Sequence, residues 1–166
     1  MTSRLLVDKI EGKTTASTVQ MPEGMVIQFK QHRYSDEHTC QSSNAYQDVT
    51  ASSFTFTPKL SNSKLFIESN VSVRINGDAQ GCATRIVVDD VAYDTPTQSH
   101  EWYFNGPSTD TQDYYDRLVK NSYVDNTSTN TRTIKLQVSN YAGSTNTKLN
   151  FLGRFQTVIT VMEIAQ

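Results

Sequence analysis

Chemically versatile side chains cluster around position 36 of the sequence. His32, Asp36, Glu37, His38 and Cys40 are all residue types that bind zinc, and they follow one another closely. The two histidines and the cysteine have the spacing H-x5-H-x-C, which matches no standard zinc pattern, and no fourth ligand is evident. We therefore interpret this stretch as part of a solvated loop, 35–45, and predict no metal ion and no other cofactor.

Acidic residues form two further groups that could do chemistry. Asp89 and Asp90 could be an acid pair, but adjacent aspartates at a hairpin tip are normally turn formers. Asp110, Asp113 and Asp116 could bind calcium, yet they lack the glycine and glutamate spacing of an EF-hand loop. We therefore predict neither an acid pair nor a calcium site.

The sequence carries no catalytic signature. It contains no G-x-S-x-G, P-loop or HExxH motif, and no nucleophile is marked by a local motif near His100 and Glu101. A glycan hydrolase would need paired carboxylates on a concave surface, which nothing in the sequence indicates. We predict that the protein is not an enzyme; only groups that the fold alone brings together could change this.

Composition narrows the classes of partner. The net charge of −2 and the lack of a basic stripe argue against nucleic acid. The sequence has no apolar run of 18 residues, so we predict no transmembrane helix and no membrane partner. The apolar run 5–7 is too short for a signal peptide, so we expect synthesis and folding in a cytoplasm. Cys40 and Cys82 should then be free thiols; a disulfide stays open if the protein ends outside a cell.

Alternating apolar and polar residues predict β-strands throughout residues 23–166. In the longest run, 64–75, the odd positions are mostly apolar and should face the core. Other runs with strand character are 25–34, 49–58, 82–88, 116–124, 131–140 and 155–166. About eight strands with mixed short and long loops, and no segment with helical periodicity, predict an all-β, antiparallel jelly-roll-like β-sandwich.

The last predicted strand is apolar on both faces. Val158, Met162 and Ile164 share one face, and Ile159 and Val161 share the other. A strand of this kind must be covered on both sides, either by the sheets of its own domain or by the same strand of a second and third copy. We predict that these five residues are trimer contacts, near the axis of a closed homotrimer.

Residues 1–22 differ from the rest of the chain. Their apolar side chains are too few to build a core, and 22–24 is a turn signal. We predict an extended attachment arm that lies on another chain, with a first strand paired inside the domain as the alternative. The predicted attachment residues are Leu5, Val7, Ile10, Val19 and Met21.

Aromatic side chains gather in and beside the predicted loop 95–112. Trp102, Tyr103, Phe104, Tyr114 and Tyr115 could close one end of the sandwich, contact a subunit or partner, or stack on a glycan. Among them Trp102, Tyr103 and Tyr114 are the candidates for distal contacts.

Both ends of the chain resemble small virion proteins of tailed bacteriophages, especially those of cyanobacteria and marine bacteria. The shared residues at the start are Leu5, Val7, Asp8 and Ile10, followed by Pro22, Gly24, Val26, Ile27 and Gln28. The ending ITVMEIAQ is also similar, and the turn Phe56-Thr57-Pro58 matches the group in character. The resemblance implies a structural protein on the virion surface with a jelly-roll-like domain, assembled as a homotrimer.

Members of this group resemble either capsid knobs or tail-fibre tips. A fibre needs a shaft, and the sequence has no heptads, collagen-like repeats or β-helix repeats. The polar spacer 11–20 spans at most about 35 Å, which suits an arm on a lattice. We therefore favour a capsid decoration (cement) protein bound to the major capsid protein. The alternative is a receptor-binding knob of a tail fibre, held by a tail or adaptor protein and recognising a host-surface glycan.

Overall fold

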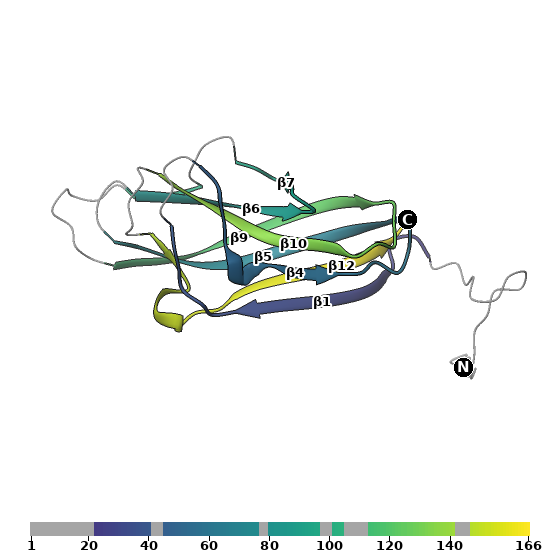
Figure 1. Cartoon of the computed structure of the whole chain (residues 1–166), viewed down its shortest axis with the longest axis horizontal. Coiled ribbons are helices and arrows are strands. Elements are labelled where there is room, and N and C mark those ends of the chain that lie inside the picture. Colours follow the sequence, from purple (N-terminus) through teal and green to yellow (C-terminus); the bar gives the residue numbers. More distant parts are fainter. Residues whose placement is uncertain (1–21, 41–44, 77–79, 97–100, 105–112, 142–146) are drawn as a thin grey trace, which may run out of the picture.

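A computed structural model shows two packed antiparallel β-sheets (Figure 1). It describes residues 22–40, 45–76, 80–96, 101–104, 113–141 and 147–166. The predicted all-β sandwich is confirmed. The predicted division into an arm, 1–22, and a domain, 23–166, stays a prediction, because almost all of the arm lies outside the described residues.

The first sheet is built around the strand with the longest predicted alternation. Its main strands, in spatial order, are β1 (Val26–Tyr34), β12 (Thr157–Ala165), β5 (Ser63–Asn76) and β9 (Asp113–Asn126). Two short strands, β11 (Lys148–Leu149) and β2 (His38–Thr39), extend it beside β5. The first long strand of the domain therefore pairs with the last, and β9 and β1 are its two long outer strands.

The second sheet is centred on β10 and β6. Its strands are β3 (Gln47–Asp48), β4 (Phe54–Phe56), β10 (Arg132–Tyr141), β6 (Gln80–Val88), β7 (Val91–Tyr93) and β8 (Trp102–Phe104). The chain passes repeatedly between the two sheets: β1, β5, β9 and β12 lie in the first, and β4, β6 and β10 in the second. This winding, with the first and last strands paired, is the connectivity of a jelly roll.

The core follows the predicted alternation of β5 and β10. Leu65, Ile67 and Val71 on β5, and Ile134 and Leu136 on β10, are fully buried. They point inward because successive side chains of a strand alternate between its two faces. The prediction of inward odd positions in 64–75 is confirmed over the whole strand, including the buried polar Ser69.

Local turn chemistry agrees with the sequence at one hairpin and departs from it at one loop. Asp89 and Asp90 both have positive φ and form the tip between β6 and β7, as predicted. The segment before β12 contains a short 3-10 helix, η2 (Phe151–Gly153), and another, η1 (Thr50–Ser52), precedes β4. Leu152 has positive φ there, a conformation that the sequence does not predict for a leucine.

Cys40 and Cys82 are buried free thiols, as predicted. Burial raises the pKa of Cys40 to about 12 and raises that of Cys82 as well, so neither forms a reactive thiolate near neutral pH. Across the described ranges, no helix has the length and apolarity needed to cross a membrane.

Candidate interaction surface

The outer face of the first sheet carries a line of apolar side chains that crosses all four main strands. Phe29 on β1 is opposite Met162 on β12, Met162 is opposite Phe66 on β5, and Phe66 is opposite Tyr123 on β9. We call these four residues the apolar row. Phe29 is 58% exposed and Tyr123 is 64% exposed, while the two central side chains are half-buried. The rings of Phe66 and Tyr123 lie 5.0 Å apart, so the row is continuous over β5 and β9.

A β-bulge brings β1 into this arrangement. Val26 is opposite Ile164 but Gln28 is opposite Glu163, so Ile27 is an extra residue between them. The extra residue reverses the alternation of the strand, and Phe29 therefore points away from the sandwich. Val26 and Ile164 lie beside the apolar row and extend it toward the end of the sheet.

Polar side chains of β1 point inward instead and close this side of the sandwich. Gln28 donates through Nε2 to the carbonyl of Thr57 at 2.8 Å, and Lys30 donates through Nζ to the carbonyl of Thr55 at 2.7 Å. The ring of His32 stacks on Phe54 at 4.9 Å. These donors satisfy carbonyls of the facing segment, which explains why β1 carries polar residues where a core strand would carry apolar ones.

A fully buried carboxylate supports the sheet beneath the apolar row. Glu163, on the inner face of β12, is 0% exposed. It accepts hydrogen bonds from the backbone N–H groups of Lys59 (2.9 Å) and Leu60 (2.8 Å), from the Ser63 hydroxyl (3.0 Å) and from Gln28 Nε2 (2.7 Å). These bonds replace lost hydration, so Glu163 ties β1, β12 and the turn before β5 together.

The predicted trimer residues divide between the two faces of β12. Ile159 and Val161 are fully buried in the chain's own core, so a partner chain cannot reach their side chains. Only the outer face of β12 is therefore open to other copies, and the set of predicted trimer contacts is reduced to the residues on that face. Val158, Met162 and Ile164 are on the outer face and half-buried, and for these three trimer contact stays a prediction.

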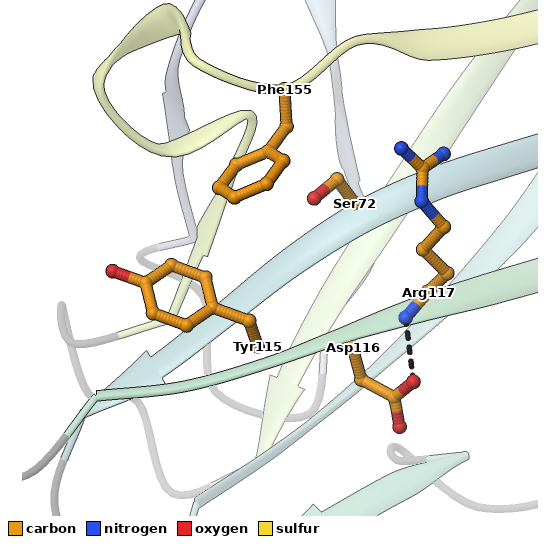
Figure 2. Close-up of a pocket in the computed structure, with 5 residues that line it drawn as sticks. All are labelled: Ser72, Tyr115, Asp116, Arg117 and Phe155. Carbon is orange, nitrogen blue, oxygen red and sulfur yellow. Dashed lines mark hydrogen bonds between the residues drawn. The ribbon is translucent and has the colours of Figure 1, made fainter.

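A cavity of about 350 Å³ lies at the other end of the same outer face (Figure 2). It is lined by Ser72, Tyr115, Asp116, Arg117 and Phe155, and we call it the aromatic cavity. Ser72 on β5 is opposite Arg117 on β9, which places both beside the Tyr115 ring. Figure 2 shows the rings of Tyr115 and Phe155 on one side and the Arg117 side chain on the other.

Neighbouring contacts hold these rings in place. The Tyr115 ring is 5.6 Å from that of Phe155 and 6.2 Å from that of Phe151. Arg74 stacks on Phe151 at 4.4 Å and pairs with Asp113, which also accepts a hydrogen bond from the Tyr115 hydroxyl at 3.2 Å. The bond from Arg74 is the main reason why the pKa of Asp113 is lowered.

Where they are described, the residues with metal-binding or catalytic potential do not form a site. No group of three or more histidine, cysteine or acidic side chains that could hold a metal occurs among the described residues. His32 contacts the Ala51 carbonyl at 2.9 Å, and Glu37 pairs with Lys148 at 2.6 Å. Asp89 and Asp90 are turn residues that pair with Arg132 and Lys135 of β10. Asp110 and His100 lie outside the described residues.

The predicted distal-contact residues lie on strands of both sheets, and their distal contact stays a prediction. Trp102 packs against the hydrophobic core and is opposite Cys82. This agrees with the alternative in which it closes one end of the sandwich. Tyr103 is 40% exposed and meets Tyr141 edge-on at 5.2 Å, whereas Tyr114 lies on β9 in the other sheet. The predicted attachment residues of the arm, Leu5, Val7, Ile10, Val19 and Met21, lie outside the described residues.

Sequence interpretation missed the residues that matter most at both ends of this face. In the run 64–75, Phe66 is on the mostly polar side. In the run 25–34, Phe29 alternates with polar residues as a core residue would. Neither position alone marks a row on the surface. An apolar residue on the outward side of a clean alternation, as at Phe66, is the signal that could have revealed it. Arg117 and Phe155 carry no sequence signal, because only strand pairing brings them together.

Comparisons with known proteins do not show a family for this chain. No family model matches it, and no curated protein matches it. Among solved structures, it is similar to a chain in the structure of the infectious bursal disease virus Gx strain, with a TM-score of 0.40 and 14% identity over 97% of this chain. It is also similar to dimeric latent PorU from Porphyromonas gingivalis, with a TM-score of 0.35 and 8% identity over 88% of this chain. The chain spans 42% and 14% of those proteins, and both likenesses are too distant to say what it does.

Proposed function

We propose that this chain is a virion structural protein without enzymatic activity, a homotrimeric capsid decoration protein that attaches to the shell through residues 1–22. The apolar row is the observation that carries the proposal. Exposed apolar patches that span several strands mark interaction sites, and this one lies on a face that the chain's own second sheet does not cover. Assembly as a trimer, on the surface of a virion made in the host cytoplasm, is what the sequence resemblance adds.

The position of the boundary residues 22–24 supports the same assembly. The Gly24 N–H donates to the Ala165 carbonyl at 3.0 Å, and the Ala165 N–H donates to the Met25 carbonyl at 2.9 Å. Gly24, at the boundary between the predicted arm and the domain, therefore lies at the end of the sheet where the apolar row lies (Figure 1). Three chains that meet through this face would project three arms from one end, and three weak contacts on one trimer bind the capsid as a unit.

Copy number and attachment test the proposal together. Quantitative mass spectrometry of purified virions should find hundreds of copies per particle, since a decoration protein follows the capsid lattice. A protein lacking residues 1–22 should keep its fold and its trimer, measured by circular dichroism and light scattering, but should not attach to undecorated particles. Full decoration by the truncated protein would contradict the arm's role, and about a dozen copies per virion would contradict the capsid location.

The second candidate is a receptor-binding knob of a tail fibre, and the aromatic cavity is the observation that favours it. Its rings and its arginine lie at the end of the sheet away from residues 22–24, where a knob would face its receptor. A count of about a dozen copies per virion, together with glycan binding, would select this candidate.

A further inference from the structure

We propose that the aromatic cavity binds an acidic saccharide, with the sugar ring against Tyr115 and Phe155 and its carboxylate on Arg117. The inference applies to a decoration protein and to a knob alike, so it does not depend on the function proposed above. It assigns a ligand to a site that lies about 20 Å from the apolar row, since Phe66 and Ser72 are six residues apart on β5.

Arg117 has unused hydrogen-bonding capacity directed at the cavity. A guanidinium has five N–H donors. In the part of the chain that the structure describes, the only recorded side-chain bond of Arg117 runs from one terminal nitrogen to Asn70 Oδ1 at 2.8 Å. The bond fixes the side chain and leaves the other donors for a ligand. A guanidinium with adjacent free donors matches the two oxygens of a carboxylate.

Two charged residues, Arg117 and Asp116, line the cavity. The Asp116 carboxylate points to the opposite side of β9 and accepts a bond from the Arg117 backbone N–H at 2.7 Å (Figure 2). Desolvation and the bond to Asp113 raise the pKa of Tyr115, and Arg74 and Arg154 act on it in the opposite direction, so two further arginines lie near the ring. An anionic ligand would be attracted by the Arg117 guanidinium, whereas a neutral ligand would not be.

The two rings define the rest of the ligand. Tyr115 and Phe155 are inclined to each other at 45°, so they form an angled apolar wall beside the arginine. A pyranose has an apolar C–H face and an edge of hydroxyl groups, and it needs a ring plane and polar groups side by side. The Ser72 hydroxyl, between the rings and Arg117, is placed for such an edge (Figure 2). A simple anion would make no use of the rings, and an apolar ligand would make no use of Arg117.

The loop that carries Phe155 is fixed before any ligand arrives. Asn150 is fully buried and has positive φ; its side chain accepts from Thr157 Oγ1 at 3.0 Å and donates to the Tyr34 carbonyl at 3.3 Å. Leu152 also has positive φ, and its N–H donates to Glu37 at 2.8 Å. Backbone strain maintained by surrounding contacts is common at binding sites, and a rigid loop lowers the entropy lost on binding.

A matched pair of sugars tests the proposal. Methyl β-D-glucuronide and methyl β-D-glucoside differ only in the carboxylate, and both can be titrated into the full-length protein by NMR. We expect the glucuronide to bind at least about tenfold more tightly, the change that one charge-assisted contact gives. Arg117→Gln should reduce its affinity to that of the glucoside, whereas Arg33→Gln, on β1 of the same face, should leave the preference intact.

Three results would overturn the proposal. The first is equal binding of the two sugars, and the second is no binding of the glucuronide at tens of millimolar. The third is a preference that survives Arg117→Gln. Tyr115→Ala gives an independent check, because it should weaken both sugars together while the change at Arg117 affects only the acidic one.

Discussion

The two ends of the outer face of the first sheet differ in their uncovered groups: apolar area at one end and hydrogen-bond donors at the other. At the end where the arm starts, Phe29 and Tyr123 expose apolar area that the described chain does not cover. At the other end, Tyr115 already packs near Phe151 and Phe155, and the unused groups are the donors of Arg117. The first end needs a large apolar partner, and the second needs a small charged one. A single sheet face can therefore serve two kinds of contact without overlap.

A polar row separates the two ends. Gln31 on β1 is opposite Thr160, Thr160 is opposite Glu68, and Glu68 is opposite Asn121 on β9. We expect the contact between copies to stop at this row, because burying the Glu68 side chain without a partner would be costly. The interface that we propose between copies thus has a defined limit.

The largest expected effect concerns the support beneath the apolar end. Glu163→Ala removes the acceptor of four donors, and the backbone N–H groups of Lys59 and Leu60 then lose the partner that they have in the structure. We expect the free energy of unfolding in urea to fall by about 3 kcal/mol. Glu23→Ala, at an exposed glutamate, should change it by less than about 0.5 kcal/mol. A loss below about 1 kcal/mol for Glu163→Ala would show that this carboxylate does not tie the strands together.

The two ends should differ in how strongly salt weakens binding to them. Raising sodium chloride from about 0.1 to about 1 M shortens the screening length from about 10 Å to about 3 Å. Association through Phe29, Phe66 and Tyr123 should change by less than about twofold, whereas binding of the glucuronide at Arg117 should weaken several-fold. Sedimentation equilibrium measures the first and NMR titration the second. If the assembly dissociated in high salt, charge rather than apolar area would hold it.

The smallest expected effect is a pH dependence at the aromatic end. Because the bond from Arg74 lowers the pKa of Asp113 below 3.8, this carboxylate stabilises the fold at neutral pH, and the contribution is lost as pH falls through the lowered pKa. The pair is near the surface, so Asp113→Asn should cost only about 0.5 kcal/mol at pH 7. The difference from the unmodified protein should vanish in strong acid. Urea unfolding at both pH values checks this, and a gap that persists in acid would assign the effect to another cause.

The strand pattern made much of the fold predictable. Clean alternation in 64–75 and 131–140 fixes which side chains of β5 and β10 face inward, because the period of a strand is two. Asp89–Asp90 predicts its hairpin, because aspartate tolerates positive φ. The same rule fails on β1, where one extra residue at Ile27 reverses the alternation and turns Phe29 outward.

The candidate sites were not predictable from the sequence, because their residues are far apart along the chain and only strand pairing brings them together. The apolar row needs the pairing of four strands that are far apart in sequence. The aromatic cavity needs the register that sets Ser72 opposite Arg117, and it needs positive φ at Leu152, which local preference disfavours. Alternation alone puts Glu163 on the face of Ile159 and Val161, but the donors that make its burial tolerable come from residues about a hundred positions earlier.

The mass of the purified full-length protein tests the central claim most directly. Multi-angle light scattering at micromolar concentration should give three times the chain mass of 18.7 kDa. The double variant Phe29→Ser/Tyr123→Ser should give the monomer, since each aromatic anchor contributes about 2 kcal/mol. Val91→Ser, at a residue 56% exposed on the other sheet, should remain trimeric. A monomeric unmodified protein, or a trimer that the double variant leaves intact, would contradict the claim that copies of this chain meet through the apolar row.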